Sequence, residues 1–218
     1  MKRPVLAVLC VLASVVVIDQ SVHAAVGDLD TSADIGKVAH PGSAKFEDGK
    51  YTVTGSGANI WKNEDAFRFV YKKMSGDLTL EADISFVGDS KQPHRKAGWM
   101  VRQSLDADSP YVDVMVHGDG HIALQTRADK GGDTTATNAD DKAPARVRLV
   151  RRGDTFEVFV SAKEQPFVSV DSVTLKMTDP VYVGLAVCSH DADASETAVF
   201  SNVVMKNEAT PATTQPAP

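Results

Sequence analysis

The stretch YVDVMVHGDGHIALQTR, residues 111–127, decides the fold class of this chain. Val112, Val114 and Val116 alternate with Asp113, Met115 and His117, and a similar alternation follows the glycine-rich centre of the stretch. A period of two places successive side chains on opposite faces of a β-strand. Gly118-Asp119-Gly120 lies between the two runs and supplies residues that tolerate positive φ. The stretch therefore predicts an antiparallel hairpin with one apolar face and one polar face.

Short apolar runs of the same kind recur along the chain and are separated by turns rich in glycine and aspartate, whereas no pattern of a long helix occurs. The eleven runs are Tyr51–Thr54, Phe67–Tyr71, Leu78–Phe86, Gly98–Ser104, Tyr111–His117, His121–Arg127, Arg146–Arg151, Phe156–Ser161, Phe167–Leu175, Tyr182–Ser189 and Thr197–Val204. Their even spacing predicts an all-β fold, a two-sheet antiparallel jelly-roll β-sandwich. Turns at Ser75-Gly76-Asp77 and Arg152-Gly153-Asp154 predict further hairpins, and the irregular segment 128–144 is expected on the rim.

Six segments of the chain carry a resemblance to a known family. They are Gly57-Ala58-Asn59-Ile60-Trp61, residues 65–71, residues 97–102, Leu124-Gln125-Thr126-Arg127, residues 146–153 and residues 183–187. Together they resemble bacterial concanavalin A-like (laminin-G-like) jelly-roll modules, a domain-of-unknown-function group related to the regulation-of-enolase family. The resemblance covers about Phe46 to Val204 and implies a concanavalin A-like sandwich. It implies no activity, because the group has no firmly assigned chemistry.

The two ends of the chain differ in composition from its centre. Basic residues at positions 2 and 3, an apolar run over 5–18 and small residues at 24 and 25 predict a signal peptide at 1–24. The apolar run is short for a membrane span, which needs about 20 apolar residues. We expect a bacterial, extracytoplasmic protein, periplasmic or secreted, with one concanavalin A-like domain at 25–206. Residues 207–218 are built of Thr, Ala, Pro and Gln and predict a disordered tail.

Cysteine content and charge limit the classes of partner. Cys188 is the one cysteine beyond the leader, so the domain must be held by its core and not by an internal disulfide. Removing Lys2, Arg3 and Asp19 with the leader leaves 21 basic and 28 acidic residues of the chain's 23 and 29. This acidic balance argues against nucleic acid and against an anionic membrane surface as partners, and no membrane insertion is expected after processing.

The polar faces of the alternating strands are the candidate binding site. The side chains predicted to contact a ligand are Arg102, Tyr111, Asp113, Gln125, Arg127 and Arg148, with Trp61 from a neighbouring turn. A concave sheet with hydrogen-bonding planar groups and a stacked aromatic would bind carbohydrate. The alternatives are a solvated face with cross-strand ion pairs and, for Trp61, an aromatic that plugs the end of the sandwich.

One strand of the sequence can be compared with a known catalytic motif. Laminarinase-type glycoside hydrolases of this fold carry three carboxylates on one strand, two of which act as nucleophile and acid/base about 5 Å apart. Glu81 and Asp83 match the first two, but Ser85 or Phe86 stands at the acid/base position. Retaining hydrolysis would then lack a proton donor, so we interpret both carboxylates as the polar edge of a strand.

Metal sites are suggested by two groups of residues. Asp191, Asp193 and Glu196 place oxygen ligands close together on a loop, which suits calcium, the one candidate cofactor. Aspartate is equally common in turns for its own hydrogen bonds. His117 and His121 are expected to face each other across their hairpin, but two histidines are two ligands short of a structural zinc site, which favours a surface pair.

The sequence as a whole predicts a secreted or periplasmic, non-catalytic β-sandwich module that binds carbohydrate or a glycan-bearing surface. A glycan-processing hydrolase or lyase on the same fold is the enzymatic alternative. A protein-interaction module of the cell envelope is the other. The evidence for any of them at this point is the fold and one polar face, and a fold does not by itself imply a function.

Overall fold

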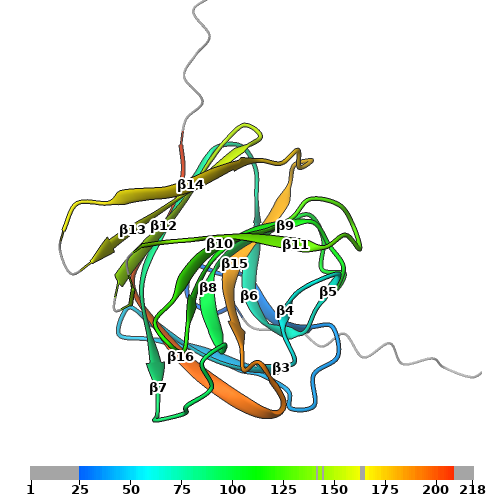
Figure 1. Ribbon diagram of the computed structural model, residues 1–218, viewed down its shortest axis with the longest axis vertical. Helices are drawn as coiled ribbons and strands as arrows, with labels where there is room; N and C mark the ends of the chain where they lie inside the picture. The colour runs from blue at the N-terminus through cyan, green and yellow to red at the C-terminus, as the bar shows by residue number, and fades with distance from the viewer. Residues whose placement is uncertain (1–24, 141, 144, 163–164, 209–218) are drawn as a thin grey trace, which may run out of the picture.

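A computed structural model describes residues 25–140, 142–143, 145–162 and 165–208. Two seven-stranded antiparallel sheets face each other, and a small hairpin lies outside them (Figure 1). The order in the first sheet is β1-β6-β15-β8-β9-β10-β11, and in the second sheet it is β14-β13-β12-β7-β16-β3-β2. The all-β sandwich predicted from the sequence is confirmed. No helix long and apolar enough to cross a membrane occurs in the described part of the chain.

The bounds of the strands follow sheet by sheet. The first sheet contains β1 (Thr31–Ile35), β6 (Phe67–Met74), β8 (Lys96–Arg102), β9 (Tyr111–His117), β10 (Ile122–Arg127), β11 (Thr134–Asn138) and β15 (Val181–Cys188). The second contains β2 (Ser43–Glu47), β3 (Lys50–Gly57), β7 (Leu78–Val87), β12 (Ala145–Arg152), β13 (Thr155–Ala162), β14 (Val168–Thr174) and β16 (Asp191–Asn207). The small hairpin pairs β4 (Ile60–Trp61) with β5 (Glu64–Asp65).

The main core fills the space between the two sheets. Every second residue of β9 contributes to it, namely Val112, Val114 and Val116, and Trp99 joins from the neighbouring β8. From the second sheet come alternate residues of β12 and β7, among them Leu149. The faces assigned by alternation in the sequence are therefore correct, because burial of one face fixes the register of each strand.

Each predicted run coincides with a strand, but one predicted turn is wrong. The turns at Gly118-Asp119-Gly120 and Arg152-Gly153-Asp154 do join paired neighbours, β9 with β10 and β12 with β13. Ser75-Gly76-Asp77 instead joins β6 of the first sheet to β7 of the second, so it is a crossing between sheets. The residues of a tight turn tolerate either connection, and only the pairing partners of the flanking strands distinguish them.

Five strands were not predicted from the sequence. β11 lies inside the segment expected to be irregular, and β1, β2, β4 and β5 are short and lack strong alternation. Asn207, the first residue of the predicted tail, is the last residue of β16. The predicted leader, residues 1–24, and residues 209–218 of the predicted tail lie outside the described residues.

Candidate functional site

The face of the first sheet that points away from the second sheet carries the candidate site, and we call it the outer face. It is not uniformly solvated, because a second apolar cluster covers part of it. Phe67, Phe69, Met100 and Tyr111 come from the strands, and Ile60 packs onto them from the small hairpin. In Figure 1, β6, β8 and β15 lie in the middle of the molecule. The small hairpin of β4 and β5 lies on one side of them, and β7 and β12 of the second sheet lie on the other. One end of the outer face is therefore closed by residues 59–66.

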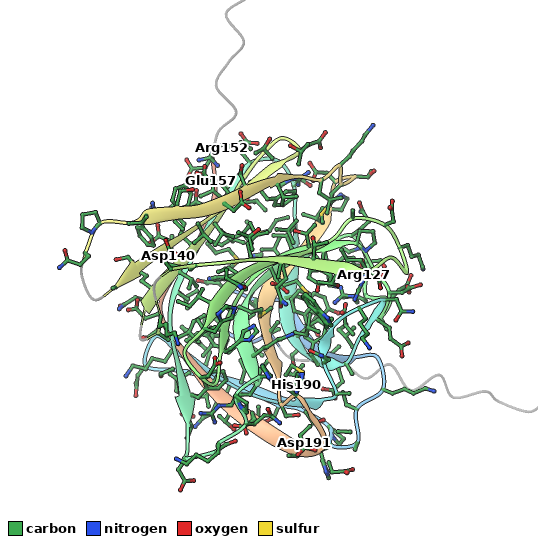
Figure 2. The ribbon with its side chains drawn as sticks, viewed as in Figure 1. Arg127, Asp140, Arg152, Glu157, His190 and Asp191 are labelled. Atoms are coloured by element: carbon green, nitrogen blue, oxygen red, sulfur yellow. The ribbon has the colours of Figure 1, made fainter. Side chains whose placement is uncertain are left out.

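Asp65 fastens the small hairpin to the sheet. Its two carboxylate oxygens accept hydrogen bonds from Arg127 at 2.7 and 2.8 Å, and Arg102 approaches one of them to 3.5 Å. The side chains of all three residues are 0% exposed. Arg127 also donates to the carbonyl oxygen of Lys62 at 2.9 Å. Figure 2 shows Arg127 at the right of the molecule, where β5 lies in Figure 1. This ion pair makes the closed end a fixed part of the fold.

The other end of the outer face holds an open pocket with a volume of about 640 Å³. Its floor comes from β8 to β11, and its walls come from the small hairpin and from loops that carry histidines. The residues that line it are Asn59, Trp61, His94, Lys96, His117, Asp119, His121, Ala123, Gln125, Ala136, Asn138 and His190.

Small side chains at the centre of the face explain why a hollow exists there. Ala123 pairs with Asn138 in register, and the next outward position pairs Gln125 with Ala136. Met115 of β9 lies between Ala123 and Gly98 of β8, and its side chain occupies the space beside that glycine. Large residues fill the face towards the closed end, and the hollow lies over the short side chains Ala123 and Ala136.

Four imidazoles surround the pocket. The ring centroids of His117 and His121 lie 5.1 Å apart, as expected from their places on either side of the hairpin turn. Those of His94 and His190 are also 5.1 Å apart. Burial, with the nearby charge of Lys96, lowers the pKa of His117 to about 3, and the same causes lower the pKa of His190. Both rings are therefore uncharged at neutral pH.

Lys96 and Asp113 form a polar layer at the base of the pocket. The ammonium of Lys96 donates to Asn59 Oδ1 at 2.8 Å and to the carbonyl oxygen of Ile60 at 2.7 Å, and so ties the strand to the hairpin. Asp113 is fully buried. Burial raises the pKa of Asp113 well above its usual range, although the charge of Lys96 opposes the shift. Burial correspondingly lowers the pKa of Lys96.

Several polar atoms at this layer have no hydrogen-bond partner among the described residues. They are both carboxylate oxygens of Asp113, Oε1 of Gln125 and Nε2 of His117. Asp113 and Gln125 are direct neighbours across β9 and β10, and both point to the outer face. More than nine in ten buried polar groups in folded proteins have a partner, so a group of exceptions next to a pocket is unusual. All of these atoms are buried, so none of them is open to a molecule in the pocket.

The structure separates the residues predicted to bind a ligand into three places. Gln125 and Trp61 line the pocket, whereas Asp113, which pairs with Gln125 on the neighbouring strand, is buried and does not line it. Arg102, Tyr111 and Arg127 belong to the closed end and are fully buried. The expectation that they present an accessible polar face is wrong, because the small hairpin covers them.

Arg148 lies in the third place, on the second sheet. β12 pairs with β7, so Arg148 faces Glu81 across the outer surface of that sheet and contacts its carboxylate at 2.7 Å. Arg146 contacts the same carboxylate at 2.8 Å. The expectation that these arginines continue the polar face of β9 and β10 is wrong, since the two groups belong to different sheets. Both oxygens of Glu81 are used in these ion pairs.

The residues predicted to bind calcium are not brought together as a set. Arg95 donates to the carboxylate of Glu196 at 2.8 Å, and this pair is largely buried. Asp191 accepts a hydrogen bond from the backbone N–H of Asp193, as aspartates do in turns. Among the residues that the structure describes, no group of three or more His, Cys, Asp or Glu side chains is arranged to hold a metal ion. Cys188 is buried, and burial raises the pKa of its thiol to about 11.

Sequence reasoning missed most of the pocket wall. Lys96 stands at the start of its strand, and His94, His190 and Asn59 lie in loops far apart in sequence. Asn138 belongs to β11, which was not predicted. Of these, Lys96 alone carried a usable signal, because the alternation of β8 places it on the same face as Arg102.

Comparison with known proteins identifies the architecture. No family model matches the chain, and no curated protein matches it significantly. A protein of unknown function from Saccharomyces cerevisiae has a similar structure, with a TM-score of 0.62, 18% identity and coverage of 82% of this chain and 97% of that one. The carbohydrate-binding module CBM66 from Bacillus subtilis is similar with a TM-score of 0.52 and 15% identity, over 83% of this chain and 98% of that one.

A third solved structure extends the same comparison to an enzyme. It is a prokaryotic β-1,3-1,4-glucanase (lichenase) from a mouse hindgut metagenome, with a TM-score of 0.50 and 8% identity, over 78% of this chain and 90% of that one. At these identities the similarities show the fold. The chain therefore has a two-sheet β-sandwich of the concanavalin A-like type.

Proposed function

We propose that the pocket on the outer face of the first sheet binds an uncharged carbohydrate, and that the protein is a non-catalytic binding module of the bacterial cell exterior. The observation that carries the proposal is that one pocket combines the polar side chains of His121 and Asn138 with the indole of Trp61. Sugars combine hydroxyl groups with apolar ring faces, and this lining offers a partner to each.

The charges around the pocket favour a neutral ligand. Lys96 directs its ammonium towards Asn59 and Ile60, and its charge interacts with the buried Asp113. The low pKa of His117 keeps that imidazole uncharged. Asp119 accepts a hydrogen bond from the backbone of His121 at the rim. The described lining thus lacks the outward-pointing guanidinium or ammonium group that recognises phosphate or carboxylate.

The size of the pocket is that of a site for a small ligand. Ligand pockets in proteins span about 300–1,000 Å³, and the volume here, about 640 Å³, lies within that range. A module of the same architecture, CBM66, is a carbohydrate-binding protein, which adds support from the fold. The kinship with the regulation-of-enolase group and the location outside the cytoplasm are parts of the proposal that rest on the sequence.

The proposal favours binding over hydrolysis because the carboxyl groups are poorly placed for catalysis. Retaining and inverting glycosidases both need two carboxyl groups that flank the scissile bond. Asp119 lines the pocket, Asp113 is buried and does not line it, and Glu81 is paired on the other sheet.

A pair of tryptophan substitutions on β11 tests the proposal. Ala136 lines the pocket and is exposed, so Ala136→Trp should fill the pocket entrance and abolish binding to any glycan that the wild-type domain retains on an array. Thr135, its neighbour, is also exposed but points to the other face of the same strand, so Thr135→Trp should bind as the wild type does. Equal binding by both variants, or no glycan binding by the wild type, would contradict the proposal. Capture of a protein ligand that Ala136→Trp does not affect would favour the cell-envelope alternative.

A further inference from the structure

The pocket is open on one side of the outer face and closed on the other. β8 to β11 provide its floor, but it does not continue over β15 and β6, the next strands in the sheet. Those strands are covered by residues 59–66 instead, since Ile60 packs with Phe67, Phe69 and Ala186. An otherwise continuous sheet surface is thereby interrupted halfway across.

The wall at the closed side belongs to residues 59–66 and is held from several directions. Lys96 of β8 donates hydrogen bonds to Asn59 and Ile60. Thr134 of β11 donates to the carbonyl oxygen of Lys62 at 2.9 Å. The side chain of Asp65 pairs with Arg127, and the backbone N–H of Asp65 donates to the carbonyl oxygen of Ala107 at 2.9 Å. Buried polar bonds of this kind are lost together, so the wall is a fixed part of the fold and not a movable lid.

The opposite side of the pocket reaches the edge of the sheet. β11 is the last strand of the first sheet, and its pocket-lining residues Ala136 and Asn138 are exposed. Asn138 Oδ1 lies 2.8 Å from Nε2 of His121, which holds that imidazole at the entrance. A ligand can therefore extend outward past β11, but it cannot extend inward past Trp61.

From this geometry we propose that the pocket takes the terminal residue of a glycan chain and not an internal stretch. The inference rests on the proposed function and specifies its ligand class. An internal residue has chain on both sides and needs two exits from a site, whereas a terminal residue needs one. The wall formed by Asn59, Ile60 and Trp61 removes the second exit.

Chain length and end-capping test the inference. The probes are linear cello-, xylo-, manno- and laminari-oligosaccharides of one to six units, with calorimetry on each series that binds the purified domain. Molar affinity should reach a plateau by the second unit. Chains are also prepared with the terminal hydroxyls blocked at the non-reducing end, at the reducing end or at both. Blocking the end that enters the pocket should weaken binding at least tenfold. Affinity that grows with each unit up to the sixth, or equal binding of chains capped at both ends, would overturn terminal recognition while leaving carbohydrate binding intact. Binding of no glycan would overturn both proposals.

A variant of the wall provides a second readout. Trp61→Ala shortens the wall but leaves the hydrogen bonds of Lys96 to Asn59 and Ile60, which use other atoms. The ratio of affinities for uncapped and capped chains should fall towards one in this variant. Glu64, which pairs with Trp61 in the small hairpin and is exposed, gives the control Glu64→Ala, in which the ratio should stay at the wild-type value. An unchanged ratio in Trp61→Ala would argue that the wall does not select chain ends.

Discussion

Arg127 and Arg148 occupy opposite environments, although alternation places each of them on the polar face of its strand. Arg127 is 0% exposed and shares two hydrogen bonds with the equally buried Asp65. The side chain of Arg148 is 30% exposed, pairs with Glu81 and stacks 3.7 Å from the ring centre of Phe167. One arginine holds a segment of chain onto a sheet, and the other lies on a solvated surface.

The difference shows that a polar face of a strand is a local property, whereas its exposure is not. The outer face of the first sheet is covered where residues 59–66 cross it and open where they do not. The outer surface of the second sheet has ion pairs of Arg146 and Arg148 with Glu81. Experiments that remove single charges should reproduce this contrast as a difference in stability.

The largest effect is expected at the covered ion pair. Asp65→Ala leaves Arg127 and Arg102 buried without their carboxylate, and breaking such a pair costs about 3–5 kcal/mol. Arg127→Ala should cost a similar amount, because it leaves Asp65 uncompensated. Urea denaturation followed by circular dichroism measures both free energies of unfolding. A cost below about 1 kcal/mol for either variant would mean that the small hairpin does not depend on this ion pair.

An intermediate effect is expected in the open pocket as the pH falls. The folded-state pKa of His117 is about 3, and the value in an unfolded chain is about 6.5, so the unfolded state binds more protons between these limits. Because the folded-state pKa is depressed, the contribution of His117 to stability is complete above pH 6.5 and is lost as the pH falls towards 3. Each pH unit below 6.5 lowers the free energy of unfolding by about 1.36 kcal/mol, so at pH 5 His117 lowers it by about 2 kcal/mol.

His117→Gln provides the comparison for this titration. The difference in unfolding free energy between wild type and variant should change by about that amount between pH 8 and pH 5, in favour of the variant at the lower pH. Parallel pH profiles for the two proteins would show that folding does not lower the pKa of His117.

The smallest effect is expected on the surface of the second sheet. Arg148→Ala removes a partly exposed ion pair, and exposed pairs contribute about 0–1 kcal/mol. The change should become smaller still in 1 M salt, because screening weakens interactions between exposed charges. Glycan binding should not change. A loss of more than about 2 kcal/mol, or of glycan affinity, would place Arg148 in the same class as Arg127 and remove the contrast.

Much of the fold was predictable because its signals lie within single strands. Val112, Val114 and Val116 occupy alternate positions of their strand, and the structure buries them between the sheets as this pattern requires. Gln125 and Trp61 were identified as candidates and line the pocket. Strands with weak alternation, such as β11 at 134–138, were missed, since short edge strands bury too little to leave a pattern.

The sequence by itself determined that the chain is all-β and which residues of each long strand face the core, because alternation is read from neighbours two positions apart. Tertiary structure alone decided that β12 joins the sheet opposite β9, which separates Arg148 from Gln125. It also decided that residues 59–66 return to cover Arg127, so that a polar face became a closed end and a pocket. Both outcomes depend on pairings between residues about 60 or more positions apart, such as Asp65 with Arg127 and Glu81 with Arg148. No local pattern encodes such pairings, since they are set by the packing of the whole chain.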